Sequence, residues 1–415
     1  MHAVIKPLKK GFFSFLTLLL VTLTLIALTE GLLRLVFSET ATQHPFIEVL
    51  PERAYTYDPD LLIALRPNTE KSFIREDKKR IEWKINSHGF RGPELKKQPK
   101  TRVMVYGDSM IQARFASLDK SLPFLLQKNL NQNDLEVINA GIVGYGPDQN
   151  FLRLKKEFPI YKPNAIVFTI FADNDYGDLV RNRLFDFKNE TLSLSTVERK
   201  KDSRIISGIE RLRIQFIVAV LAKNRKRQER KKELNLNKYH NHTMIPDWLV
   251  DRSQSEHTVF LNQKPQRYSH FDDHYDIDLA TSPNSESALT KIKFMGAILD
   301  QVQAFCDTKN IPVLFVILPS STDLCKNLPL NFESLSNTFP NYRRENLTQP
   351  LELHFKKKGY AYLNLYLPFK SHPSPWSLFF NGADNHWNEA GMALAAPLIA
   401  KKLKNQSPKL FPPLK

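Results

Sequence analysis

Two widely separated groups of residues have the types and spacing of a serine-based acyl-transfer site. A serine hydroxyl is a weak nucleophile until a neighbouring base takes its proton, and Ser109, in the segment Gly107-Asp108-Ser109-Met110, is the candidate. His386, near the C-terminus, is the candidate base, and Asp384 precedes it by two residues. Such a carboxylate could orient the imidazole and stabilise its protonated form, as in a Ser-His-Asp triad. These residue types predict nucleophilic attack by Ser109 on a carbonyl group.

Two further groups could stabilise the negative charge that this attack creates on the carbonyl oxygen. The segment Ile138–Gln149 contains Gly141, Gly144 and Gly146, and glycine lets a backbone N–H approach a ligand closely. Asn174 follows an apolar run, and its side-chain amide can donate a hydrogen bond to an oxyanion. Taken alone, each group also has a structural interpretation, as a turn, a glycine-rich loop, a solvated loop or a surface histidine. Their order along the chain favours the catalytic interpretation.

The elements that must position these residues follow an alternating pattern. Short apolar runs rich in Val and Ile are separated by amphipathic stretches such as Leu122–Leu130 and Ala288–Phe305, and a polar helix is expected near Arg343–Lys358. The predicted strands are Arg102–Tyr106, Glu136–Asn139, Ala165–Phe171, Val313–Leu318 and Tyr360–Leu367. This alternation predicts an α/β fold with a parallel sheet covered on both faces, and five strands suit a flavodoxin-like three-layer sandwich. Ligands bind outside the carboxyl ends of such strands, where the candidate residues lie.

The order of these motifs resembles that of the SGNH (GDSL-type) hydrolase superfamily, over roughly residues 100–180 and 288–400. The shared order is G-D-S, then N-x-G-x-x-G, then a strand followed by N-D, then a C-terminal Asp-His pair. The resemblance implies that Ser109 is the nucleophile and His386 its base. It also implies an oxyanion hole formed by the Ser109 N–H, the Gly144 N–H and the Asn174 side chain. The segment NSHGFRG and the lysine-rich link after it look like those of bacterial membrane-anchored members.

One departure from the family pattern bears on the reaction. The usual spacing is D-x-x-H, but position 383 is Ala383, and the spacing here is D-x-H followed by Trp387. This variant is similar to the SGNH-like domains of alginate O-acetyltransferases, which modify exported polysaccharide. The leading hypothesis is an exported esterase acting on an acyl ester, an acetyl ester in the first instance, of a cell-envelope glycan or lipid. A polysaccharide O-acyltransferase using the same residues is the first alternative, and a non-catalytic, membrane-tethered glycan-binding or assembly protein is the second.

The N-terminus predicts a membrane anchor. Gly11–Leu28 is eighteen residues without a charge, and Lys6, Lys9 and Lys10 stand just before it. The positive-inside bias keeps these lysines cytoplasmic and places the catalytic domain in the periplasm or outside the cell. A cleaved signal peptide is the alternative, although the run exceeds a typical h-region and no A-x-A site follows. The net charge of +16 favours anionic partners, and export argues against nucleic acid among them.

The composition divides the chain into five expected regions. They are a cytoplasmic stub with the anchor (1–37), a β-rich lead-in (38–100), the first half of the SGNH-like domain (101–185), a basic insertion (186–287) and the second half (288–405). Within the insertion, Arg199–Lys232 carries thirteen Lys or Arg against three Asp or Glu. Such a stretch could lie on an anionic membrane surface, but a solvated helical insertion is the simpler interpretation. We expect the insertion to form a lid or rim over the site.

No metal or other cofactor is expected. A polar cluster, comprising His240, His242, His270, Asp272, Asp273, His274 and Asp276, has an H-x₃-H spacing, but its segment lacks a helical apolar pattern. The two cysteines exclude a four-cysteine zinc site. An exported domain lies where disulfides persist, Cys306 ends a predicted helix and Cys325 follows the next strand, so a Cys306–Cys325 disulfide is predicted, with two separate free thiols as the alternative.

Overall fold

The computed structural model describes residues 2–36, 54–56, 58, 60–75, 77–195, 244–262, 274–380 and 385–412. The chain divides into two units, residues 1–52 with 200–236 and residues 53–199 with 237–415. In the first unit, α1 (His2–Val36) is a single long helix. Its segment Phe13–Leu32 has a mean hydropathy of 2.1 and is almost entirely exposed. By length and composition it can cross a bilayer, and a signal sequence has the same properties.

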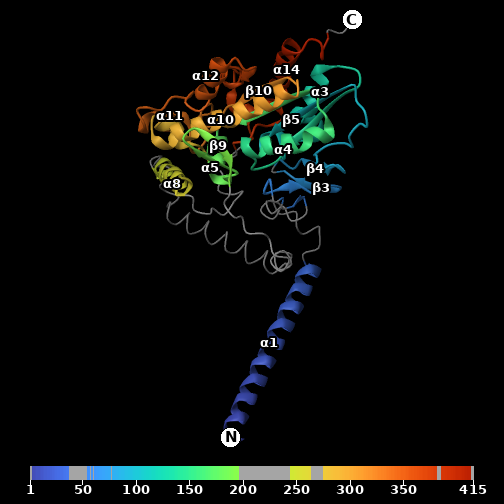
Figure 1. The fold of residues 1–415 in the computed structure, drawn as a ribbon, viewed down its shortest axis with the longest axis vertical. Helices are drawn as coiled ribbons and strands as arrows, with labels where there is room; N and C mark the ends of the chain where they lie inside the picture. Colours follow the sequence, from blue (N-terminus) through green and yellow to red (C-terminus); the bar gives the residue numbers. More distant parts are fainter. Residues whose placement is uncertain are drawn as a thin grey trace. The chain divides into compact units, whose positions relative to one another are not determined.

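The second unit is built on a five-stranded parallel sheet (Figure 1). Its strands are β5 (Thr101–Gly107), β6 (Leu135–Gly141), β7 (Ala165–Phe171), β10 (Val313–Leu318) and β11 (Tyr362–Asn364), in the order β11-β10-β7-β5-β6. The first strand along the chain therefore lies inside the sheet, between the second and the third. This is the flavodoxin-like order, and it confirms the predicted fold class.

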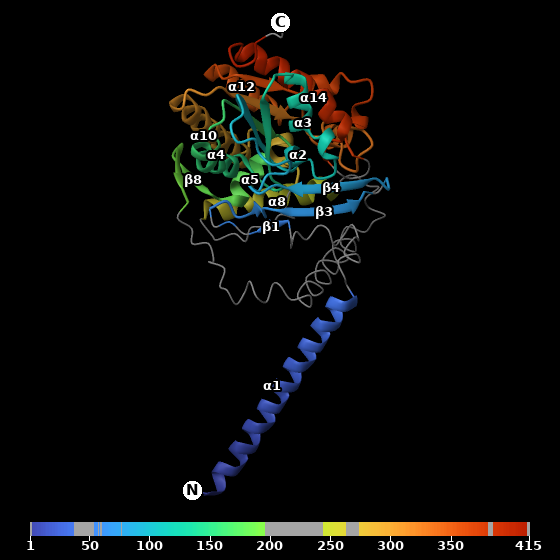
Figure 2. The same cartoon turned by 90° about the vertical axis from the view of Figure 1, so that its right-hand side faces the viewer.

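The strands carry apolar side chains on both faces of the sheet, and a layer of helices covers each face. Along β5, Met104 and Tyr106 point into one core, whereas Val103 and Val105 point into the other. The first core is covered by α4 (Pro147–Tyr161), α5 (Asp175–Asn182), α8 (Met244–Leu261), α9 (Ile277–Thr281), α10 (Glu286–Thr308), α11 (Phe332–Thr338) and α12 (Gln349–Lys358). The second is covered by α2 (Ser109–Gln112), α3 (Leu122–Leu130), α13 (Tyr366–Lys370) and α14 (Glu389–Gln406), with short turns η2 (Leu118–Lys120) and η4 (Pro375–Leu378) (Figures 1 and 2).

The described part of the lead-in forms two small antiparallel pairs, visible beside the main sheet in Figure 2. They are β1 (Tyr55–Thr56) with β2 (Ala64–Leu65), and β3 (Thr69–Ile74) with β4 (Arg80–Ile85). Residues along β4 are alternately exposed and buried, so that Ile81, Trp83 and Ile85 enter a third core. Ile142 and Tyr145, from the loop after β6, complete that core. The lead-in therefore packs directly on a loop at the carboxyl edge of the sheet.

The described part of the insertion lies at its two ends. A hairpin of β8 (Phe185–Lys188) and β9 (Thr191–Leu194) begins it, and α8 and α9 end it. Leu249 and Phe260 of α8 are buried in the first core, so this helix is an integral part of that layer. The basic stretch Arg199–Lys232 lies outside the described residues.

The predicted Cys306–Cys325 disulfide is wrong. Both cysteines are buried free thiols. Cys306 lies in the core on one face of the sheet and Cys325 in the core on the other, so the sheet separates them. Burial raises the pKa of Cys306 to about 12 and that of Cys325 to about 11, so neither is a thiolate at neutral pH.

We therefore expect both thiols to stay free when the protein is purified under oxidising conditions. Unfolding the purified protein without reductant should expose two titratable thiols per chain, and adding reductant should leave the thermal unfolding midpoint unchanged. A titration of less than one thiol per chain, restored by reductant, would contradict this.

Candidate active site

The strand order brings the candidate residues to one place. The chain leaves β5 for β6 on one side and then crosses to β7 on the other, so the loops after these neighbouring strands diverge at a topological switch point. Ser109 follows β5, Gly144 follows β6 and Asn174 follows β7. Gly107 pairs with Gly141 in the sheet, which aligns the ends of β5 and β6. Three of the sequence motifs thus emerge from adjacent strands at the same edge.

The turn that carries Ser109 is short and tightly packed. Asp108 caps α2, and its carboxylate accepts a hydrogen bond from the Met110 N–H at 2.8 Å. Ser109 is the first residue of the helix and is buried. A Cβ atom on Gly141 would lie 2.3 Å from the backbone nitrogen of Gln112, so only glycine lets β6 approach α2 this closely. Packing alone therefore requires glycine at this position of the second motif.

The candidate nucleophile and its candidate base are in contact. The distance from Ser109 Oγ to His386 Nε2 is 2.7 Å, which is a hydrogen bond. The neighbouring Trp387 is buried, and its indole N–H donates to the Met110 carbonyl at 2.9 Å. This hydrogen bond joins the loop that carries His386, here called the histidine loop, to the turn that carries Ser109. The Phe380 N–H donates to the His386 carbonyl at 3.0 Å. In this geometry the hydroxyl proton can pass directly to the imidazole.

Of the other predicted site residues, Gly144 and Asn174 belong to the described residues, whereas Asp384 does not. Asp384 and Ala383 lie outside the described residues, so the carboxylate expected to orient His386 is not placed. Gly144 has a φ of +73°, the left-handed region that favours glycine, in the loop between β6 and α4. Asn174 is buried and precedes the first turn of α5. Both residues thus belong to the edge that carries Ser109.

A contact that the sequence analysis missed ties the histidine loop to the end of β7. Asp173, directly before Asn174, is buried and accepts hydrogen bonds from the Ser320 hydroxyl and, at 2.9 Å, from Asn385 Nδ2. Ser320 follows β10, and Asn385 is the neighbour of His386. The only signal in the sequence is that Asp173 and Ser320 both stand just past predicted strands, at the edge where ligands bind.

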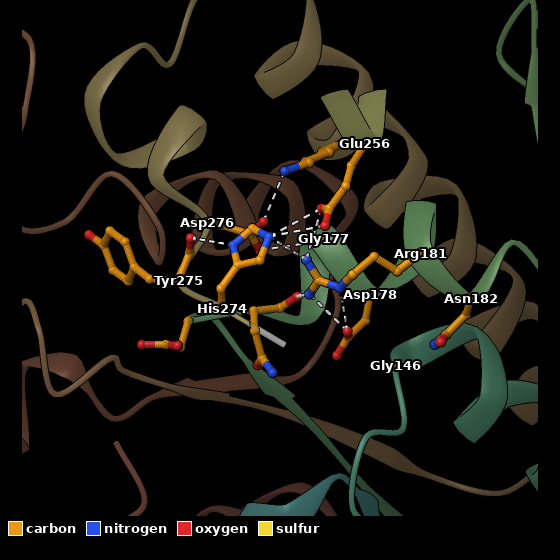
Figure 3. Close-up of polar contacts among 12 residues, drawn as sticks. Gly146, Gly177, Asp178, Arg181, Asn182, Glu256, His274, Tyr275 and Asp276 are labelled. Atoms are coloured by element: carbon orange, nitrogen blue, oxygen red, sulfur yellow. Dashed lines mark hydrogen bonds and ion pairs between the residues drawn. The ribbon is translucent and has the colours of Figure 1, made fainter. Parts of the chain in front are cut away.

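Asp178, Arg181, Glu256 and His274 form a buried network (Figure 3), and Arg181 joins it to the turn that carries Asn174. The Arg181 guanidinium donates to the Asn174 carbonyl at 3.0 Å and pairs with Asp178 at 2.8 Å and Glu256 of α8 at 3.2 Å. His274 Nε2 lies 3.2 Å from the Glu256 carboxylate. Burial raises the pKa of Glu256, but the His274 hydrogen bond and the Arg181 charge outweigh it and lower the pKa to about 2. Glu256 is therefore ionised and holds Arg181 against Asn174.

Asp276 holds the same turn from a second side (Figure 3). Its carboxylate accepts from the Gly177 N–H at 2.9 Å, and its own N–H donates to the Asp173 carbonyl at 2.7 Å. Lys291 is fully buried and donates to both Asp276 and Asp278 at 2.9 Å. Residues from the end of the insertion thus fix the backbone on either side of Asn174.

Of the polar cluster considered as a metal site, only His274 and Asp276 belong to the described residues. His274 contacts Glu256, and Asp276 pairs with Lys291. Among the ranges that the structure describes, no group of three or more His, Cys, Asp or Glu side chains is arranged to hold a metal ion.

Comparisons with known proteins find similar solved structures only. No protein-family model and no curated protein matches the sequence. A lipase/acylhydrolase from Enterococcus faecalis is 12% identical, with a TM-score of 0.36, over 74% of this chain and 96% of that one. The esterase EstA from Pseudoalteromonas sp. is 12% identical, with a TM-score of 0.33, over 75% and 98%. A GDSL-like lipase from Bacteroides thetaiotaomicron is 9% identical, with a TM-score of 0.35, over 75% and 93%. At such scores, the case for a function depends on this chain's own geometry.

We expect Lys291→Met to lower the free energy of unfolding by about 3–5 kcal/mol, because it leaves two carboxylates buried without their cation. Denaturant titration at neutral pH measures the change. Lys293→Met, on the same helix, is the matched control, since Lys293 pairs with Glu190 in solvent and its loss should have no measurable effect. Equal stability of the two variants would contradict the structural importance of the buried network.

Proposed function

We propose that this chain is a serine esterase of the SGNH type. The observation that carries the proposal is the 2.7 Å contact between Ser109 Oγ and His386 Nε2 at the switch point of a flavodoxin-like sheet. The contact joins residues 277 positions apart, and each stands in a motif that resembles this superfamily. A non-catalytic binding protein has no need for a base aligned on a serine hydroxyl, so this geometry favours catalysis.

The mechanism assigns one role to each residue. Ser109 Oγ attacks the ester carbonyl carbon while its proton passes to His386 Nε2. The Ser109 N–H, the Gly144 N–H and the Asn174 side chain stabilise the oxyanion, and removal of one such donor costs ~10²–10³ in rate. As the tetrahedral intermediate collapses, His386 gives its proton to the leaving alcohol and the acyl group stays on Ser109. Asp384 orients the imidazole from its Nδ1 side.

Deacylation completes the cycle and decides between the two enzymatic alternatives. His386 takes a proton from water as the water oxygen attacks the acyl-enzyme, and the collapse of the second intermediate returns that proton to Ser109 Oγ. A sugar hydroxyl in place of water would make the protein an O-acyltransferase. Release of free acetate in the presence of an acceptor glycan supports hydrolysis, whereas acetylated glycan would show transfer.

We further propose that the substrate is an acyl ester on a cell-envelope glycan or lipid. Support comes from α1, whose apolar segment follows three lysines and would keep the catalytic unit on the exported side. The net charge of +16 favours an anionic surface or polymer as its surroundings.

We expect Ser109→Ala and His386→Ala each to abolish turnover of p-nitrophenyl acetate without unfolding the protein, because each removes one partner of the proton transfer. A fluorophosphonate probe should label the wild-type serine and leave Ser109→Ala unlabelled. Labelling that persists in Ser109→Ala would refute the nucleophile assignment.

In the same assay, Asp384→Asn should lose more of the rate than Asp108→Asn, because the Asp108 carboxylate caps α2.

We expect the chain to remain in the membrane with its C-terminus exported. Alkaline phosphatase fused after Lys415 should be active, a reporter that fluoresces only in the cytoplasm should be dark, and carbonate washing should not release the protein. A soluble product whose N-terminus begins near residue 30 or later would show instead that the segment is a cleaved signal.

A further inference from the structure

Side chains of the lead-in donate hydrogen bonds to the backbone carbonyls at the end of α2 and just after it. Arg91 donates to the carbonyls of Gln112, Ala113 and Ala116. The Trp83 indole donates to the Arg114 carbonyl at 2.9 Å, and Arg75 donates to the Phe115 carbonyl at 2.8 Å. Five consecutive carbonyls, from residue 112 to residue 116, thus accept from side chains of the lead-in. The residues concerned lie outside any strand, so this pairing fixes their path.

Arg75 extends from this segment to the histidine loop. Its guanidinium pairs with Glu389, the first residue of α14, at 2.9 Å and lies 5.1 Å from the centroid of the Phe380 ring. Glu389 follows His386 in the chain and Phe380 precedes it. One side chain therefore contacts the segment after Ser109 and both flanks of the base.

The aromatic ring at residue 115 completes this connection. The Phe115 ring meets the His386 imidazole edge-on, with 5.9 Å between the ring centroids, and meets the Phe380 ring in the same way at 5.8 Å. Such edge-to-face pairs have preferred orientations. A shift of the Phe115 backbone would therefore move the surface against which the imidazole rests.

The position of Arg75 is itself well defined. Asp77 binds the guanidinium through two hydrogen bonds, at 2.9 Å and 2.6 Å, and the Arg75 side chain is only 15% exposed. A bidentate carboxylate fixes the plane of the guanidinium as well as its place. Lysine cannot reproduce this, because its ammonium is a point charge without a planar fork.

We propose that Arg75 is a positioning residue that keeps His386 Nε2 within hydrogen-bond distance of Ser109 Oγ. This inference rests on the proposed function. Arg75 then gives this part of the lead-in a role in positioning the base, although no residue of the lead-in takes part in proton transfer. Because misplacing a reacting group by about 1 Å can cost on the order of 10²-fold in rate, loss of Arg75 has a kinetic effect that exceeds its effect on folding.

The test compares Arg75→Ala with Lys79→Ala in the full-length protein in detergent. Lys79 bonds the same Glu389 oxygen at 3.1 Å, but its described contacts do not include Phe115 or Phe380. Hydrolysis of p-nitrophenyl acetate gives kcat and KM, and fluorophosphonate labelling counts the competent serines. We expect Arg75→Ala to lower kcat per labelled serine by on the order of 10²-fold with KM unchanged. Arg75→Lys should recover only part of that loss, and Lys79→Ala should match the wild type.

Two results would overturn the inference while leaving the proposed function intact. One is an Arg75→Ala enzyme as fast as Lys79→Ala. The other is an Arg75→Ala sample with fewer labelled serines but an unchanged rate for each, which would make Arg75 a folding residue only. A wild-type protein that neither hydrolyses the ester nor reacts with the probe would refute the proposed function itself, and this inference with it.

Discussion

The turn that carries Ser109 runs into backbone carbonyls that lie outside any sheet, and the edge that carries the candidate site depends on how these groups are satisfied. A buried carbonyl left unpaired costs about 1–3 kcal/mol. Side chains of the lead-in pair with residues 112–116, and Trp387 pairs with the Met110 carbonyl. Because Trp387 adjoins His386, the contact that completes the turn also brings the histidine to the serine. The two are therefore positioned together.

The turn that carries Asn174 is fixed by different means. Charged side chains surround it, with Arg181 on the Asn174 carbonyl and Asp276 on the Gly177 N–H, and the last part of the insertion supplies several of them. Burying charges costs several kcal/mol for each ion unless the pairing is nearly complete. A network of this kind consequently tolerates little rearrangement, which suits the role proposed for the Asn174 amide as a donor to a transient oxyanion. The lead-in, which precedes the sheet in the chain, thus holds the turn that carries Ser109. The insertion, which interrupts the sheet, holds the turn that carries Asn174 at the same edge.

The local sequence pattern predicted several helices and strands, but it did not predict which remote residues contact one another. Ala165–Phe171, Val313–Leu318 and Leu122–Leu130 have the predicted bounds, because uniform burial or a regular helical period defines them. The last strand is shorter than predicted, Tyr362–Asn364, since α13 begins at Tyr366. The cysteine pairing failed because spacing along the chain does not tell which face of the sheet a residue joins. Contacts such as Asp173 with Asn385 depend on remote segments and leave no local signal.

Two buried carboxylates near this edge, Glu256 and Asp323, differ in their partners, and therefore in their charge and in how they contribute to stability. Glu256 faces a histidine and an arginine, and its pKa falls to about 2. Its contribution is present above its unfolded pKa of about 4.3 and is lost as the pH falls through 2. Asp323 accepts only from the hydroxyls of Tyr275 and Tyr342 among its described side-chain partners, and burial raises its pKa to about 7. Its contribution is present below about 3.9 and is lost as the pH rises through 7. The two carboxylates thus oppose each other in their pH dependence, because the partners of Glu256 outweigh its burial, whereas the tyrosine hydroxyls and the Arg344 charge do not outweigh that of Asp323.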